Sequence, residues 1–149
     1  MQKTLTVRSL SEMDRFAKQI AAHLFPGAII GLKGELGSGK TTLTKYLARH
    51  LGIQETVNSP TFTILKDYRG LLPLYHMDVY RLEGIGYDYE LDDFIYGQGV
   101  SVIEWFPYIS EMLPEHILEI EILGQNDQVR TIHVKGEGPY ETIVQTLSD

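Results

Sequence analysis

Apolar and polar residues alternate along several stretches of the chain with a period of two, which is typical of strands with one buried face. In the clearest stretch, LEIEIL at 118–123, apolar residues alternate with Glu119 and Glu121. The turn sequence GQNDQ and the stretch VRTIHVKG at 129–136 follow it, so the two stretches predict an antiparallel hairpin. A shorter alternation, TLTVR at 4–8, predicts another strand.

Two other segments have apolar residues three and four positions apart, which is the spacing of amphipathic helices. Ser9 followed by Glu12 matches a capping box, and the apolar pattern after it predicts a helix that ends before Pro26. The second helix is expected to begin at Lys40 and to end at Gly52.

Continuous apolar runs, AIIGLKG at 28–34 and GVSVIEW at 99–105, predict strands that are buried on both faces. The stretch 61–81 predicts two strands joined by a turn near 69–70. The remaining segments with helical character are 89–95 and 140–149. No repeat or linker interrupts residues 1–149, so we expect one α/β domain with a mixed parallel and antiparallel sheet flanked by helices.

The formal net charge of the 149 residues is −7, and the charges are unevenly distributed. Residues 1–81 hold 11 Lys and Arg against 6 Asp and Glu, whereas residues 82–149 hold 2 against 14. The second part therefore cannot neutralise the phosphates of a nucleic acid. Two interpretations of it remain, a solvated acidic face and a docking surface for a basic partner.

The composition also limits the location and the metal chemistry of the protein. The absence of cysteine excludes disulfides and thiolate metal sites. No apolar run reaches the roughly 20 residues that span a bilayer, and the first residues lack the apolar core of a secretion signal. We therefore expect a soluble cytoplasmic protein that does not contact a membrane.

The segment GELGSGKT, residues 34–41, matches the phosphate-loop pattern G-x-x-x-x-G-K-[ST] between a predicted strand and a predicted helix. Glycines let the backbone turn its N–H groups toward a phosphate, and the positive end of the helix faces the same anion. In this pattern Lys40 reaches the β- and γ-phosphates and the Thr41 hydroxyl binds Mg²⁺. The expected phosphate-binding residues are Gly37, Ser38, Gly39, Lys40, Thr41 and Thr42.

A phosphate loop of this kind works with an acidic residue at the end of a neighbouring strand. Glu104 ends the apolar run VSVIE and is the candidate for holding Mg²⁺ or water, although a surface glutamate after a core strand would look the same. DYRG at 67–70 fits the D-x-x-G element of GTPases but lies in the predicted turn, and no Asn-Lys-x-Asp element exists for guanine. GTPase specificity is therefore rejected.

Two further clusters have candidate chemistry. NSPTF at 58–62 has the character of a switch segment that senses the γ-phosphate, or of a strand entry with a proline. In HMDVYR, His76, Asp78 and Tyr80 would share one strand face. Asp78 could orient the attacking water or support Mg²⁺ through water, Arg81 could meet phosphate charge, and the alternative is a structural hydrogen-bond network.

Taken in order, GELGSGKTT, NSPTFTI, LYHMDVYR and VIEW resemble the TsaE family of bacterial P-loop ATPases over nearly the whole chain. The resemblance implies Mg²⁺-dependent ATP hydrolysis, slow without partners, that supports the formation of threonylcarbamoyladenosine in tRNAs reading codons that begin with A. It also implies that the protein binds the TsaD and TsaB proteins and acts with them, with tRNA involved only indirectly.

The resemblance also implies roles for single residues. Lys40, Asp78 and Glu104 would be catalytic, and Thr41 and Glu104 would bind Mg²⁺. Thr61 would belong to the switch segment, and Trp105 would be a functional aromatic residue. By analogy, the adenine pocket would lie near Leu10, Ser11 and Arg130.

Two other functions fit the residues. The first is a kinase for a small metabolite, although the chain has six Arg and none at 82–129, where a basic lid would be expected. The second is a scaffold that binds a nucleotide without hydrolysing it. Phosphate release without an acceptor would argue against the kinase, and turnover would argue against the scaffold.

Overall fold

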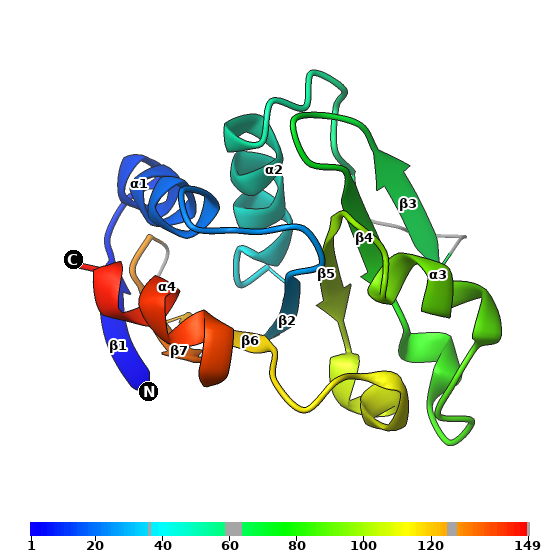
Figure 1. Ribbon diagram of the computed structural model, residues 1–149. Helices are drawn as coiled ribbons and strands as arrows, with labels where there is room; N and C mark the ends of the chain where they lie inside the picture. Colours follow the sequence, from blue (N-terminus) through cyan, green and yellow to red (C-terminus); the bar gives the residue numbers. More distant parts are fainter. Residues whose placement is uncertain (36, 59–63, 125–127, 149) are drawn as a thin grey trace.

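The computed structural model describes residues 1–35, 37–58, 64–124 and 128–148. Within these ranges, seven strands form one sheet in the order β1-β7-β6-β2-β5-β4-β3 (Figure 1). The strands are β1 (Gln2–Val7), β2 (Ile29–Gly34), β3 (Leu65–Tyr68), β4 (Leu74–Asp78), β5 (Val100–Glu104), β6 (Leu118–Gly124) and β7 (Arg130–Lys135). The predicted α/β class with a mixed sheet is confirmed.

The helices are short, and several are of the 3₁₀ type. The α-helices are α1 (Leu10–Ala21), α2 (Lys40–His50), α3 (Asp92–Ile95) and α4 (Glu141–Thr146). The 3₁₀-helices are η1 (Tyr80–Leu82), η2 (Tyr89–Leu91), η3 (Phe106–Met112) and η4 (Gly138–Tyr140). Ser9 caps α1 by accepting a hydrogen bond from the Glu12 N–H, as the capping-box sequence predicts.

The centre of the sheet is parallel and its two sides are antiparallel. β2 runs parallel to both β5 and β6, and β4 runs parallel to β5. The antiparallel pairs are β3 with β4, β6 with β7, and β7 with β1. Every residue of β5 is buried, as expected of a central strand that is covered on both faces. Burial alternates along β6, as expected of a strand that is covered on one face.

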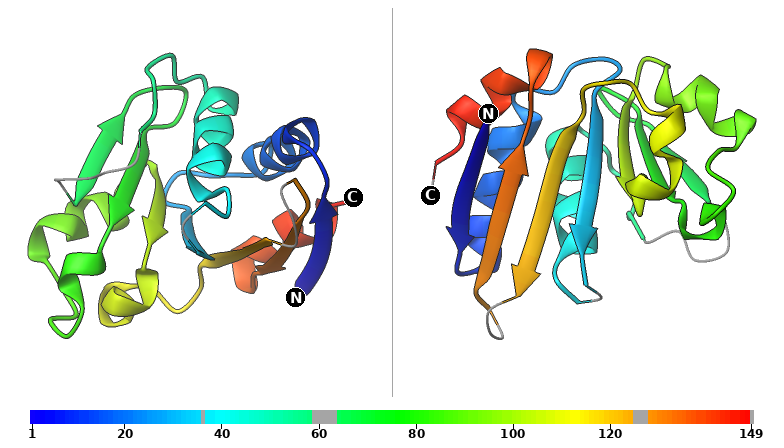
Figure 2. Two further views of the ribbon diagram at one scale, coloured as in Figure 1. Left: turned by 180° about the vertical axis from the view of Figure 1, so that it is seen from behind. Right: turned by 90° about the horizontal axis from the view of Figure 1, so that it is seen from below.

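Two apolar clusters lie on opposite faces of the sheet. The larger cluster joins α1, α2 and α4 to the sheet and includes Ile20, Leu47 and Val144. The smaller cluster joins β2, β4 and β5 to the segment that contains α3 and η3, and includes Met77, Ile103 and Ile109. Over β1, β7 and β6 this second face carries no helix and stays open (Figure 2).

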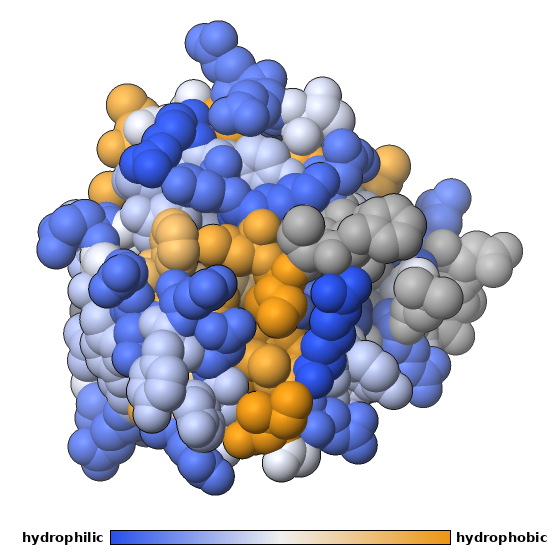
Figure 3. Space-filling view, turned by 90° about the vertical axis from the view of Figure 1, so that its right-hand side faces the viewer, coloured by the Kyte–Doolittle hydropathy of each residue, from blue (hydrophilic) through white to orange (hydrophobic). Residues whose placement is uncertain are grey.

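The side of the molecule near β3 and α3 carries a strip of apolar side chains between hydrophilic ones (Figure 3). Leu65 of β3 and Phe94 of α3 are only partly buried and pack against the smaller cluster. The smaller cluster therefore extends to the surface on this side. In the part of the chain that the structure describes, every helix falls short of the length and apolar character needed to cross a membrane.

Candidate functional site

Three parallel strands bring the predicted site residues to one edge of the sheet. Leu32 of β2 pairs with Glu104 of β5, and Asp78 of β4 pairs with Glu104 from the other side. Glu104 and Asp78 are the last residues of their strands, and the glycine loop follows β2 directly. The carboxyl ends of parallel strands are where α/β proteins bind ligands. The candidate site therefore lies at this edge.

The loop after β2 needs glycine at several positions. Gly37 and Gly39 have φ angles of 81° and 114°, a region that L side chains rarely adopt. A Cβ atom at Gly34 would lie 2.5 Å from Oγ of Ser38 and 2.9 Å from the carbonyl of Ile122. The chain then enters α2 at Lys40, so the N-terminal end of α2 faces the loop.

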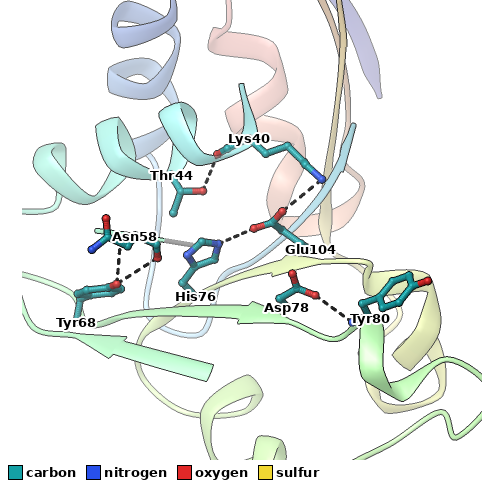
Figure 4. A network of polar contacts seen from close by, with 8 residues as sticks. All are labelled: Lys40, Thr44, Asn58, Tyr68, His76, Asp78, Tyr80 and Glu104. Carbon is teal, nitrogen blue, oxygen red and sulfur yellow. Dashed lines mark hydrogen bonds and ion pairs between the residues drawn. The ribbon is translucent and has the colours of Figure 1, made fainter. Parts of the chain in front are cut away.

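Lys40, Glu104 and His76 form a chain of polar contacts at the centre of this site (Figure 4). The Nζ atom of Lys40 lies 3.3 Å from Oε1 of Glu104. Nε2 of His76 lies 2.9 Å from the other carboxylate oxygen of Glu104. Only 7% of Glu104 and 0% of His76 is exposed. Both oxygens of a buried carboxylate are thus paired with nitrogen atoms.

The surroundings of Glu104 keep its carboxyl group ionised. Burial raises its pKa, but the interactions with His76 and Lys40 outweigh burial, and the net pKa lies below its ordinary value. A buried carboxylate of this kind is ready to accept a cation. Sequence analysis named both Glu104 and His76 but missed their contact, because strand order and register decide it.

Asp78 lies beside this group but takes part in a different interaction. Its Oδ1 atom accepts a hydrogen bond from the Tyr80 N–H at 3.1 Å, which makes a turn at the end of β4. The expectation that His76, Asp78 and Tyr80 share one strand face is wrong for Tyr80. The strand ends at Asp78, and Tyr80 lies in η1 with 53% of its surface exposed.

Three aromatic residues, Tyr80, Trp105 and Tyr108, form a cluster that reaches Lys40 through Trp105. Trp105 stacks on Tyr108 with ring centroids 5.5 Å apart and contacts Tyr80 edge-on at 5.0 Å. The Lys40 ammonium lies 5.8 Å from the Trp105 ring. Trp105 adopts a left-handed backbone conformation, with φ of 64°, and is 41% exposed. This conformation carries a cost, and it turns a large aromatic side chain outward beside the loop.

A pocket lies between the glycine loop, α1 and the start of β7. Its volume is about 620 Å³, and its lining combines loop residues with residues of α1 and the start of β7. The predicted residues that line it are Leu10, Ser11, Gly37, Ser38, Gly39, Thr42 and Arg130. Val7, Met13 and Gln128 also line it and were not expected from the sequence. The structure therefore brings residues from both ends of the chain to the glycine loop.

The remaining predicted residues have different positions. Thr41 lies in the first turn of α2. Thr61 and most of the predicted switch segment lie outside the described residues. Asn58 is described, and its backbone N–H and carbonyl both contact the Tyr68 hydroxyl, at 3.3 and 3.4 Å. This contact ties the start of the predicted switch segment to β3.

The glycine loop is suited to bind an anion, and Glu104 is suited to bind Mg²⁺. The Ser38 hydroxyl is buried, and within the described residues it has no hydrogen-bond partner, so it is available to a phosphate oxygen. The described part of the chain holds no cluster of three His, Cys, Asp or Glu residues that could bind a metal alone. Mg²⁺ commonly takes only one or two protein ligands and completes its shell with phosphate oxygens and water. Glu104 and Thr41 match that requirement.

This geometry defines the class of the protein: an α/β protein in which a glycine loop connects a central parallel strand to a helix at the carboxyl edge of the sheet. The chain belongs to the TsaE family, because the family model described as threonylcarbamoyl adenosine biosynthesis protein TsaE matches residues 7–132.

Similar proteins support this assignment. A tRNA threonylcarbamoyladenosine biosynthesis protein TsaE from Bacillus subtilis is 48% identical over 92% of this chain and 88% of its own length. The protein of that name from Treponema pallidum is 42% identical over 85% of this chain and 96% of its own length. The crystal structure of Bacillus subtilis YdiB superposes with a TM-score of 0.80 at 40% identity, covering 97% of this chain and 93% of that one.

Proposed function

We propose that this protein binds ATP with Mg²⁺ and hydrolyses it, and that the hydrolysis supports the formation of threonylcarbamoyladenosine in tRNA. Membership of the TsaE family supports the tRNA modification. The glycine loop and the residues beside it support the nucleotide chemistry. The partners would be the TsaD and TsaB proteins, in the cytoplasm, with tRNA contacted only through them.

The observation that supports hydrolysis best is the arrangement of Lys40 and Glu104. A cation at the start of α2 and a buried, ionised carboxylate at the end of β5 lie within 3.3 Å of each other, directly after the glycine loop. A phosphate loop needs this pair, one charge for the phosphates and one for the metal ion. The Ser38 hydroxyl adds a donor to the same loop.

Each residue would have a definite task in this reaction. The loop N–H groups and Lys40 would bind the β- and γ-phosphates, and Glu104 and Thr41 would hold Mg²⁺, which neutralises phosphate charge when bound. Asp78 would orient the attacking water, since it lies one strand away from Glu104 at the same edge. Leu10 and Ser11 would contact the nucleoside in the pocket of about 620 Å³, which Arg130 also lines.

A steady-state assay of phosphate release tests the proposal. We expect slow release from Mg-ATP by the protein alone, without any added acceptor, and faster release with TsaD and TsaB present. Asp78→Ala should bind ATP with unchanged affinity and lose most of the release, whereas Asp67→Ala, a change on the neighbouring strand β3, should leave release unchanged. Tight ATP binding without release, even with both partners, would show a non-hydrolysing scaffold instead.

A further inference from the structure

Arg130, the first residue of β7, contacts the glycine loop from its outer side. Its Nε atom donates to the carbonyl of Ser38 at 2.8 Å, and its Nη2 atom donates to the carbonyl of Gly37 at 3.4 Å. Its Nη1 atom donates to the carbonyl of Val129 at 3.1 Å. One planar guanidinium thus binds two successive carbonyls of the loop and one of its own hairpin, a fork geometry that lysine cannot reproduce.

These contacts fix the orientation of two successive peptide groups of the loop. In a trans peptide the carbonyl and the N–H of the next residue point to opposite sides. The Ser38 carbonyl points to Arg130, so the Gly39 N–H points away from it. The Gly37 carbonyl also points to Arg130, and the Ser38 N–H donates on the other side to the carbonyl of Glu35 at 3.0 Å.

The loop has reason to need such a restraint. Gly37 and Gly39, on either side of Ser38, are the residues with the greatest backbone freedom, and a peptide between glycines rotates easily. Anion binding is tighter when a loop N–H already points toward the phosphate, because reorienting it on binding would cost affinity. A side chain that binds the opposite carbonyls supplies that order in advance.

We propose that Arg130 is a positioning residue for phosphate binding, which holds the Gly37 and Ser38 carbonyls so that the loop keeps its shape and the Gly39 N–H faces the bound phosphate. The inference rests on the proposed nucleotide binding and adds a role to it. Arg130 also lines the pocket of about 620 Å³, so direct contact with the nucleoside is the competing outcome.

Calorimetry with two ligands, ATP and inorganic tripolyphosphate, separates these roles, because tripolyphosphate has the phosphates without the nucleoside. The variants are Arg130→Ala and Arg130→Lys, and Lys135→Ala, an exposed change at the far end of β7, is the control. Circular dichroism and the thermal midpoint of each variant establish that it is folded at the temperature of the titration.

We expect both Arg130 variants to lose about tenfold or more in affinity for tripolyphosphate and for ATP by the same factor, with the control unchanged. A loss for ATP alone would overturn the inference and assign Arg130 to the nucleoside. Unchanged affinity for both ligands would also overturn it, whereas a wild-type protein that binds neither ligand would overturn the proposed function itself. If Arg130→Ala fails to fold, the Arg130→Lys variant tests the inference, because it keeps the positive charge but cannot donate to both loop carbonyls as the guanidinium does.

Discussion

Lys40 and Glu104 neutralise each other across 3.3 Å at the carboxyl edge of the sheet. In the proposed reaction each of the two has a different partner: Lys40 binds the phosphates, and Glu104 binds the metal ion. Binding of Mg-ATP would therefore replace one ion pair by two new ones. The pair also keeps a buried carboxylate compensated, and removing one partner of such a pair is costly.

Lys40→Ala should abolish ATP hydrolysis. The change removes the cation that would stabilise charge on the transferred phosphoryl group, so we expect the turnover rate to fall about a hundredfold or more. A phosphate-release assay measures the loss, and calorimetry should show weaker ATP binding. Lys45→Ala, an exposed change on the same helix, is the control and should retain activity. Normal turnover by Lys40→Ala would remove the loop from the mechanism.

Glu104 should contribute to stability in a pH-dependent way. Its pKa in the folded protein lies below the ordinary value of 4.5, so the ionised group stabilises the fold above pH 4.5. That contribution is lost as the pH falls through the folded pKa. Glu104→Gln should therefore lower the thermal midpoint most near neutral pH, and the difference from wild type should shrink below pH 4.5.

The exposed Glu115→Gln is the control for this measurement, and its thermal midpoint should follow that of the wild type at every pH. A constant difference between wild type and Glu104→Gln across the whole pH range would show that the lost contact is one of packing and not of charge.

His76 should affect the reaction through Glu104. His76→Leu removes the donor to Oε2 of Glu104, leaving that oxygen without its buried partner, so we expect hydrolysis to need about tenfold more Mg²⁺ for half-maximal rate. His76→Gln places an amide donor near the same oxygen and should lose less. A titration of activity against Mg²⁺ at saturating ATP measures this. An equal Mg²⁺ requirement in all three proteins would make His76 a packing residue.

Trp105 should report nucleotide binding by fluorescence, because it is the single tryptophan of the chain and its ring lies 5.8 Å from the Lys40 ammonium. Movement of Lys40 toward a phosphate would change the surroundings of the indole. We expect a saturable change in emission on adding Mg-ATP, and no change at the same concentration in Lys40→Ala. If the emission of the wild-type protein does not change at saturating nucleotide, Trp105 lies away from the nucleotide site.

The sequence predicted the glycine loop and the strand and helix around it because that motif is local. It placed the end of α1 too late: apolar residues continue to Leu24, but the helix ends at Ala21 and Leu24 packs against the core from the segment after the helix. The segment 89–95 is helical, as predicted, but consists of η2 followed by α3. The periodicity of apolar residues shows which residues are buried, but it says less about where a helix ends and which type of helix forms.

The contacts that the sequence could not give depend on strand order. His76 reaches Glu104 because β4 and β5 are neighbours with Asp78 opposite Glu104, and no local pattern determines this register. Arg130 reaches the loop because the hairpin of β6 and β7 pairs with β2. The sequence suggested Arg130 only through the family resemblance, as part of the adenine pocket, and gave no sign of its contacts with the loop carbonyls.

The position of β7 between β1 and β6 has a consequence for synthesis on the ribosome. Ser38 and Arg130 are 92 residues apart, so the glycine loop leaves the ribosome long before the strand that contacts it. β1 likewise emerges early and pairs with β7. Contacts between such distant segments form late, since they require most of the chain. A nascent chain that stops short of β7 would carry the complete loop motif within an unfinished sheet, and the ability to hold phosphate would arise only as the last strands are added.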